Sequence, residues 1–154
     1  MDVKKQENEK LTEESFVKTK DGSLDFGEIP LDIADVIGRQ AAKIRLRHGN
    51  EKQGLVHIEQ RHKADMRALG FDDALDFISE VTQNFTAIYK NTGENSRSLV
   101  LVDKTGKLKI VSVQLEPSAE GDFYEVKNAT PGRQEQFKNK APLWERAGPS
   151  TSSE

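Results

Sequence analysis

Two of the three histidines of this 154-residue chain, His57 and His62, lie five positions apart with Arg61 between them. Histidine is the side chain whose unperturbed pKa lies near neutrality, so a close pair can transfer protons or bind a ligand. A helical zinc site would favour histidines four apart, and the chain contains no cysteine. We therefore expect no metal ion and no cofactor here. Packing or a solvated surface is the ordinary alternative for such a pair.

Other catalytic patterns are missing from the sequence, which has no G-x-S-x-G turn, no P-loop and no GxGxxG. Adjacent carboxylates occur only in the N-terminal segment and at a predicted helix start, where solvation and capping explain them. Metal-free acid–base chemistry remains, and ribonuclease-type cleavage is one form of it. A base would take the 2′-hydroxyl proton, an acid would protonate the 5′-oxygen, and cations would stabilise the phosphate. The residues suited to these tasks are His57, Arg61, His62, Arg97, Tyr124, Thr130, Lys138 and Lys140.

The histidines are predicted to lie on one helix, over 53–69, that ends at Gly70. His62 falls in line with the apolar positions Ile58 and Met66, so we expect it to face the body of the protein. His57 and Arg61 share an adjacent face at the margin of that stripe. The segment 39–67 carries eight basic and three acidic residues, which suits either a solvated helix face or a patch that attracts phosphate.

The remaining pattern predicts an α+β fold. Apolar periodicity indicates a short helix from Leu31 and a second long helix over 72–85, whereas alternation indicates a short strand over 43–47. Four further strands with hairpin-sized connections are predicted over 87–90, 98–103, 109–115 and 123–128. We expect the N-terminal helices to pack on one face of a mostly antiparallel sheet of four to five strands. A short polar helix over 132–140 and a docked segment around Trp144 should follow.

Length and composition indicate one domain with tails. Residues 1–25 are rich in charge and predict a flexible linker, 26–146 the folded domain, and 147–154 a disordered tail. No apolar run suits a membrane span or a secretory signal, so no membrane partner is expected. The net charge of −3 resides in the first 30 residues, which hold five lysines and eight acidic residues. The neutral remainder does not suggest a generally sticky nucleic-acid binder.

Several motifs along the chain, taken in order, resemble the phage-associated members of the barnase, EndoU, colicin and RelE (BECR) nuclease superfamily. These motifs are FGEIP, DIADVIG, KIRLRHG, GLVHIEQRH, LDFISEVTQNFTAIY, SLVLVDKTGKLKIVSVQLEP, FYEVKNATP and KNKAPLWER. Such domains are found at the C-termini of MuF-type phage proteins and polymorphic toxins. The resemblance implies a metal-independent endoribonuclease of the toxin type, delivered as part of a larger protein and acting on RNA in the cytoplasm. An immunity protein is a possible partner that it also implies.

The resemblance also assigns residues. It matches His57, Arg61 and His62 to the family's helix motif and Thr130 to its Ser/Thr before proline. The lysine before the terminal Leu-Trp is Lys138 or Lys140. The predicted catalytic set is therefore His57, Arg61, His62, Thr130 and Lys140, and the predicted substrate-binding set is Arg97, Ser98, Tyr124 and Lys138. The alternative is a non-catalytic phage-derived structural or binding domain that keeps the fold, which the near-neutral body favours.

Overall fold

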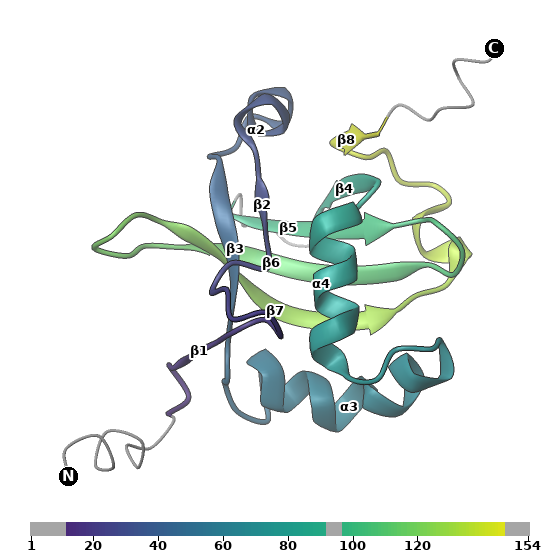
Figure 1. Ribbon diagram of the computed structural model, residues 1–154. Helices are drawn as coiled ribbons and strands as arrows, with labels where there is room; N and C mark the ends of the chain where they lie inside the picture. Colours follow the sequence, from purple (N-terminus) through teal and green to yellow (C-terminus); the bar gives the residue numbers. More distant parts are fainter. Residues whose placement is uncertain (1–11, 92–96, 147–154) are drawn as a thin grey trace, which may run out of the picture.

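The computed structural model describes residues 12–91 and 97–146, which form a mixed α+β fold (Figure 1). The α-helices among these residues are α2 (Leu31–Ile37), α3 (Gly54–Ala68) and α4 (Ala74–Asn84), and η1 (Gln134–Phe137) is a 3-10 helix. The strands are β1 (Phe16–Val17), β2 (Gly27–Ile29), β3 (Ala42–Arg47), β4 (Ala87–Lys90), β5 (Ser98–Asp103), β6 (Lys109–Glu116), β7 (Phe123–Pro131) and β8 (Trp144–Glu145).

All eight strands belong to one sheet, in the order β1-β3-β7-β6-β5-β4-β8, with β2 also paired to β3. Strands β4 to β7 form an antiparallel meander, as their short connections predict. The only parallel contact among the described strands joins β3 to β7, where Ile44 and Arg45 pair with Tyr124 and Glu125. Beyond Glu125, no strand within the described part of the chain pairs with this edge of β7, and α3 packs against β7 instead (Figure 1).

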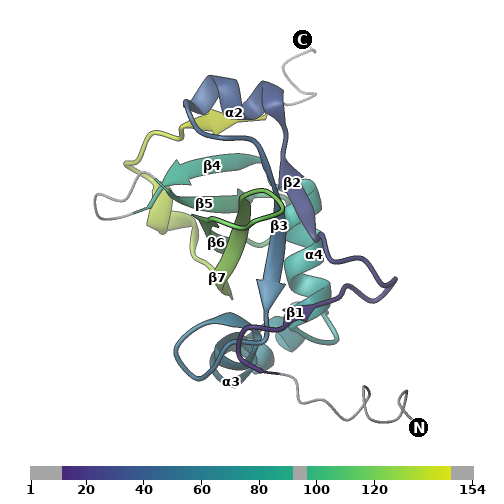
Figure 2. The same ribbon diagram turned by 90° about the vertical axis from the view of Figure 1, so that its left-hand side faces the viewer.

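The two faces of the meander are covered differently. Helix α4 crosses one face, and its apolar side joins the main core around Phe77, Ile78 and Val81. The other face carries a small second cluster over β4 to β6, against which Phe137 of η1 packs. Figure 2 shows α4 and the C-terminal segment on opposite sides of the sheet. The β7 side of that second face carries polar side chains, described below.

Local sequence accounts for the helix ends. The side chain of Asp73 accepts a hydrogen bond from the backbone N–H of Asp76 at 3.1 Å, which caps α4 as its position predicts. Gly38 ends α2 in the left-handed conformation that glycine adopts without strain. None of the helices described is long and apolar enough to cross a membrane.

The mixed α+β class is as expected, but the predicted count of four to five strands is wrong. Strands β1, β2 and β8 contain only two or three residues each, too few for alternation to be visible in the sequence. The linker prediction is also wrong for part of 1–25, because Phe16 and Val17 pair with β3 and Val17 is buried. Residues 1–11 and the predicted tail over 147–154 lie outside the described part of the chain.

The sequence predicts that the N-terminal helices all pack on one face of the sheet, but the structure differs. Only α4 lies across the sheet, whereas α3 lies along β7 and α2 contacts β8 (Figures 1 and 2). Trp144 does dock: its ring packs edge-on against Phe85, with centroids 5.6 Å apart.

Candidate functional site

The loop that leads into α3 is built around two glycines. Gly49 and Gly54 have φ of +66° and +83°, values that glycine adopts without strain. They also lie against each other: a Cβ on Gly49 would come within 2.0 Å of the Gln53 carbonyl oxygen, and one on Gly54 within 2.8 Å of the Gly49 Cα. The side chain of Asn50 closes the turn by accepting from the backbone N–H of Lys52 at 2.7 Å. The start of α3 is therefore fixed relative to β3.

This loop also orients His57, in the first turn of α3. Its Nδ1 lies 3.0 Å from the carbonyl oxygen of Glu51, an acceptor, so Nδ1 carries the proton of the neutral ring. The lone pair is then on Nε2. The His57 side chain is partly exposed, so this nitrogen can exchange a proton with a substrate or contact it.

His62, one and a half turns later, is oriented by β7. Its Nδ1 lies 3.3 Å from the hydroxyl oxygen of Thr130, and that hydroxyl donates to the carbonyl oxygen of Pro131 at 3.0 Å. When the hydroxyl donates to Pro131, its oxygen accepts from Nδ1–H of His62, and the carboxylate of Asp65, 3.8 Å from Nδ1, favours the same tautomer. Burial lowers the pKa of His62 below its usual value, against the opposing carboxylate of Asp65 at 3.8 Å. His62 is accordingly held neutral near pH 7, with its lone pair on Nε2.

The two rings stand edge to face, with centroids 6.3 Å apart and an interplanar angle of 85°. Arg61 is exposed on the turn between them. His62 is half-buried, its side chain 22% exposed, rather than part of the buried stripe that Ile58 and Met66 form. The structure therefore brings together three of the sequence-predicted residues, His57, His62 and Thr130, and places Arg61 at their margin.

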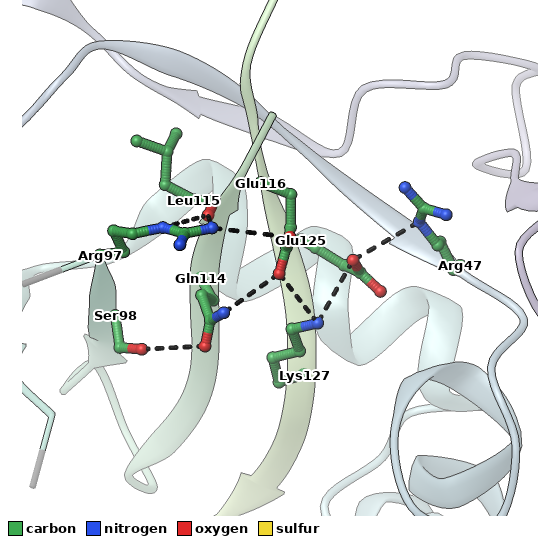
Figure 3. Close-up of polar contacts among 8 residues, drawn as sticks. All are labelled: Arg47, Arg97, Ser98, Gln114, Leu115, Glu116, Glu125 and Lys127. Atoms are coloured by element: carbon green, nitrogen blue, oxygen red, sulfur yellow. Dashed lines mark hydrogen bonds and ion pairs between the residues drawn. The ribbon is translucent and has the colours of Figure 1, made fainter. Parts of the chain in front are cut away.

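A second polar cluster occupies the same sheet face closer to β3 (Figure 3). At its centre is Glu125 of β7, whose side chain is only 7% exposed. Its Oε1 lies 3.3 Å from Nζ of Lys127 and 3.4 Å from Nε of Arg47. Lys127 also pairs with Glu116 at 3.3 Å. One nearly buried carboxylate is thus held between two cations on adjacent strands.

The predicted substrate-binding residues Arg97 and Ser98 belong to this second cluster. The guanidinium of Arg97 donates to the carbonyl oxygen of Leu115 at 2.7 Å and 3.0 Å and lies 3.7 Å from Glu116. Ser98 is buried, and its hydroxyl donates to the amide oxygen of Gln114 at 3.2 Å. Both residues are thus tied to β6 (Figure 3).

A register shift in β7 links the two clusters. Opposite Ser112 and Val113 of β6, β7 contains one extra residue, Lys127. Directly paired residues point to the same side of a sheet. Thr130, which pairs with Ile110, therefore shares a face with Glu125, which pairs with Gln114.

Three predicted residues lie elsewhere. Tyr124 is buried, donates to the carbonyl oxygen of Gln40 at 2.7 Å, and has a pKa that burial raises. Its partner Leu115 belongs to the main core, so Tyr124 faces α4. Lys138 and Lys140 are exposed, and Nζ of Lys140 lies over the ring of Phe137 at 5.8 Å. Phe137 packs on Tyr89 of β4, three strands from β7 and roughly 14 Å away at the usual strand spacing.

Sequence reasoning missed the core of the second cluster, namely Arg47, Gln114, Glu116, Glu125 and Lys127. A signal for part of it was present: Glu125 and Lys127 flank Val126 in a strand that begins with two aromatic residues, and a charge in a strand between buried neighbours usually requires a partner. The identity of the partners depends on the pairing of β3 with β7, which the local pattern does not contain.

Within residues 12–91 and 97–146, no group of three or more His, Asp or Glu side chains is arranged to hold a metal ion. Comparison with known proteins provides no relative, since neither a protein-family model nor a curated protein matches the chain. The arguments that follow therefore rest on the geometry of this sheet face.

Proposed function

We propose that this protein is a metal-independent endoribonuclease of the BECR type, whose reaction takes place between His57 and His62. The observation that carries the proposal is the pairing of His62 with Thr130, which holds a neutral imidazole 6.3 Å from a second one. A hydrogen bond spans about 3 Å, so a phosphodiester placed between the two rings can have a different oxygen within hydrogen-bond distance of each ring.

In the proposed reaction, Nε2 of His62 takes the proton from the ribose 2′-hydroxyl. The 2′-oxygen attacks phosphorus, the bond from phosphorus to the 5′-oxygen breaks, and protonated His57 gives its proton to that oxygen. The products are a 2′,3′-cyclic phosphate and a 5′-hydroxyl. Arg61 stabilises charge on the phosphate oxygens, while Thr130 keeps His62 in the required tautomer and orientation. A role for Lys138 or Lys140 would require substrate to extend to the β4 side of the sheet.

The test is RNA cleavage by the purified chain in EDTA. We expect His62→Ala and His57→Ala each to lower the rate by about 10² to 10⁴, the range for loss of a general acid or base. His48→Ala is the matched control, because the third histidine lies in the turn before α3 and outside the pair. Wild-type rates for His62→Ala would refute the assignment.

The near-neutral charge of the body supports a second candidate, a non-catalytic binding domain with the same fold. The same assay separates the two functions. A binding domain leaves total RNA intact in every variant, whereas a nuclease yields defined fragments with 2′,3′-cyclic phosphate ends.

A further inference from the structure

A polar cavity of about 290 Å³ lies beside the histidine pair and has no role in the reaction proposed above. Its walls come from the sheet, from the loop that orients His57, and from the segment that precedes β1. The lining residues are Glu13, Glu14, Arg47, Gly49, Asn50, Gln53, Glu116, Glu125 and Lys127. We propose that this cavity is a nucleobase subsite that selects guanine next to the scissile phosphate, an inference that rests on the proposed function.

The charge of the cavity excludes a phosphate site. Four carboxylates and two cations line it, which gives a formal charge of −2. A phosphodiester in this cavity would be repelled overall. A neutral ligand that offers both hydrogen-bond donors and acceptors is the better match, and nucleobases in single-stranded RNA are recognised along their edges in this way.

Guanine fits the arrangement of these charges. Its O6 and N7 are acceptors of the kind that Arg and Lys recognise, and its N1–H and exocyclic amine are neighbouring donors that suit one carboxylate. Arg47 and Lys127 supply the donors, and Glu125 supplies the acceptor. Adenine and cytosine each offer a single exocyclic amine beside a ring acceptor, so they cannot use the carboxylate in the same way.

The subsite is rigid, as selection requires. Glu125 is nearly buried and fixed by both cations, while Lys127 is fixed in turn by Glu116 (Figure 3). The Nε atom of Arg47 is buried 3.4 Å from Oε1 of Glu125 without a hydrogen bond of good geometry, so the polar network around Glu125 is not fully satisfied within the protein. A preorganised set of donors and acceptors discriminates between bases more strongly than a flexible one.

The N-terminal segment closes the outer wall. The backbone N–H of Gly49 donates to the Glu13 carbonyl oxygen at 2.8 Å, and the side-chain amide of Asn50 donates to the Glu13 carboxylate at 3.0 Å. The adjacent Glu14 lines the cavity from the same segment. Part of the segment whose composition predicts a linker would therefore contribute to substrate recognition.

The cavity is also near enough to the histidines. The loop over 49–53 forms one of its walls, and Glu51 in that loop accepts from His57. On the other side, Lys127 is three residues from Thr130, about 10 Å along β7. The base of a nucleotide adjoining the scissile phosphate can span this separation.

The test is binding of the five nucleoside 3′-monophosphates of guanine, adenine, cytosine, uracil and hypoxanthine to the wild-type chain, followed by NMR. We expect the guanosine nucleotide to bind at least about tenfold more tightly than the first three alternatives. Inosine monophosphate, which lacks only the exocyclic amine, should bind several-fold more weakly. Shifts should centre on Glu125, Lys127 and the Arg47 Nε–H. Equal affinities, or shifts confined to another surface, would overturn the subsite.

Variants locate the contacts. Glu125→Gln should abolish the preference for guanine, and Glu14→Gln, at an exposed position, should weaken guanosine nucleotide binding several-fold without unfolding the chain. Glu80→Gln is the control, since Glu80 is exposed on α4 across the sheet. If Glu125→Gln does not fold, the wild-type nucleotide series and the Glu14→Gln variant still test whether the cavity binds guanine.

Mapping of cleavage sites separates this inference from the proposed function. Cleavage of RNA at all bases alike, with equal nucleotide affinities, would leave the nuclease in place and remove the subsite. Selective binding of guanosine nucleotide by a chain that cleaves no RNA would remove the nuclease and keep the subsite.

Discussion

Replacement of Thr130 by valine is the most specific test of how His62 is held. Valine keeps the shape of threonine but removes the hydroxyl, so Nδ1–H of His62 loses its acceptor at 3.3 Å. That hydrogen bond is stronger for the charged ring than for the neutral one. Its loss should therefore lower the pKa of His62 further below the usual value, from which burial already depresses it.

The expected effects of Thr130→Val on stability and on the cleavage rate follow from the loss of this one hydrogen bond. A buried hydrogen bond contributes about 1 kcal/mol, which in a chain of this length lowers Tm by about 2 to 4 °C. A loss of about 1.4 kcal/mol in transition-state stabilisation would slow RNA cleavage about tenfold. The acidic limb of the pH profile of kcat/KM should move to lower pH together with the NMR titration of His62.

Thr86→Val is the matched control for this experiment. Thr86 immediately precedes β4. Its hydroxyl donates to the Val102 carbonyl oxygen at 3.3 Å and accepts from the backbone N–H of Lys104 at 3.0 Å. It should cost similar stability without changing the titration of His62. An unchanged His62 titration in Thr130→Val would refute the geometry described for the pair.

Three further predictions follow from the structure. Gly49→Ala should destabilise the fold by more than about 3 kcal/mol in urea unfolding, because the new Cβ would strike the Gln53 carbonyl oxygen. Gly106→Ala is the control: Gly106 has a similar φ of +69° but open space around it, so this substitution should cost only about 1 kcal/mol. Because the pKa of His62 is depressed in the folded state, the unfolded state binds the proton more tightly. The free energy of unfolding should therefore fall as the pH drops below about 6.5 and level off below the pKa of the folded state. His62→Gln should remove this part of the pH dependence. Thr82→Val removes a buried hydroxyl that donates at 2.7 Å to a backbone carbonyl just before β2, and a loss of about 1 to 2 kcal/mol is expected in the same unfolding assay.

The elements that the sequence predicted well are those whose signal is local. Helix α4 has a strong apolar side and an aspartate cap, β4 and β5 are short apolar runs, and β6 alternates over most of its length. Their limits therefore lie within about two residues of expectation. The end of β7 was placed too early, at Asn128 instead of Pro131, because the extra residue at Lys127 breaks the alternation. A bulge hides the continuation of a strand from any method based on period.

For the candidate site, helical phase and the resemblance together suggested His57, His62 and Thr130 as neighbours, and the structure does place them together. The C-terminal lysines were grouped with them on the resemblance alone, as the lysine before the terminal Leu-Trp. The packing of Phe137 on Tyr89 carries that segment across the sheet instead. Such a contact depends on which strands adjoin in space, and no local pattern encodes it.

The extra residue in β7 has an evolutionary consequence. If β7 alternated regularly through all of its residues, positions 125 and 130, one odd and one even, would point to opposite sides of the sheet, and Thr130 would face α4 instead of His62. The bulge takes one residue out of this alternation, so the two polar clusters depend on the bulge for their common side. Deletion of Lys127 would keep both clusters on one side of the sheet, because Val126 and Asn128 would still lie opposite Val113 and Ser112. Insertion of one more residue between Glu125 and Thr130, without a second bulge, would instead turn Thr130 away from His62, although every residue of the histidine pair would still be present.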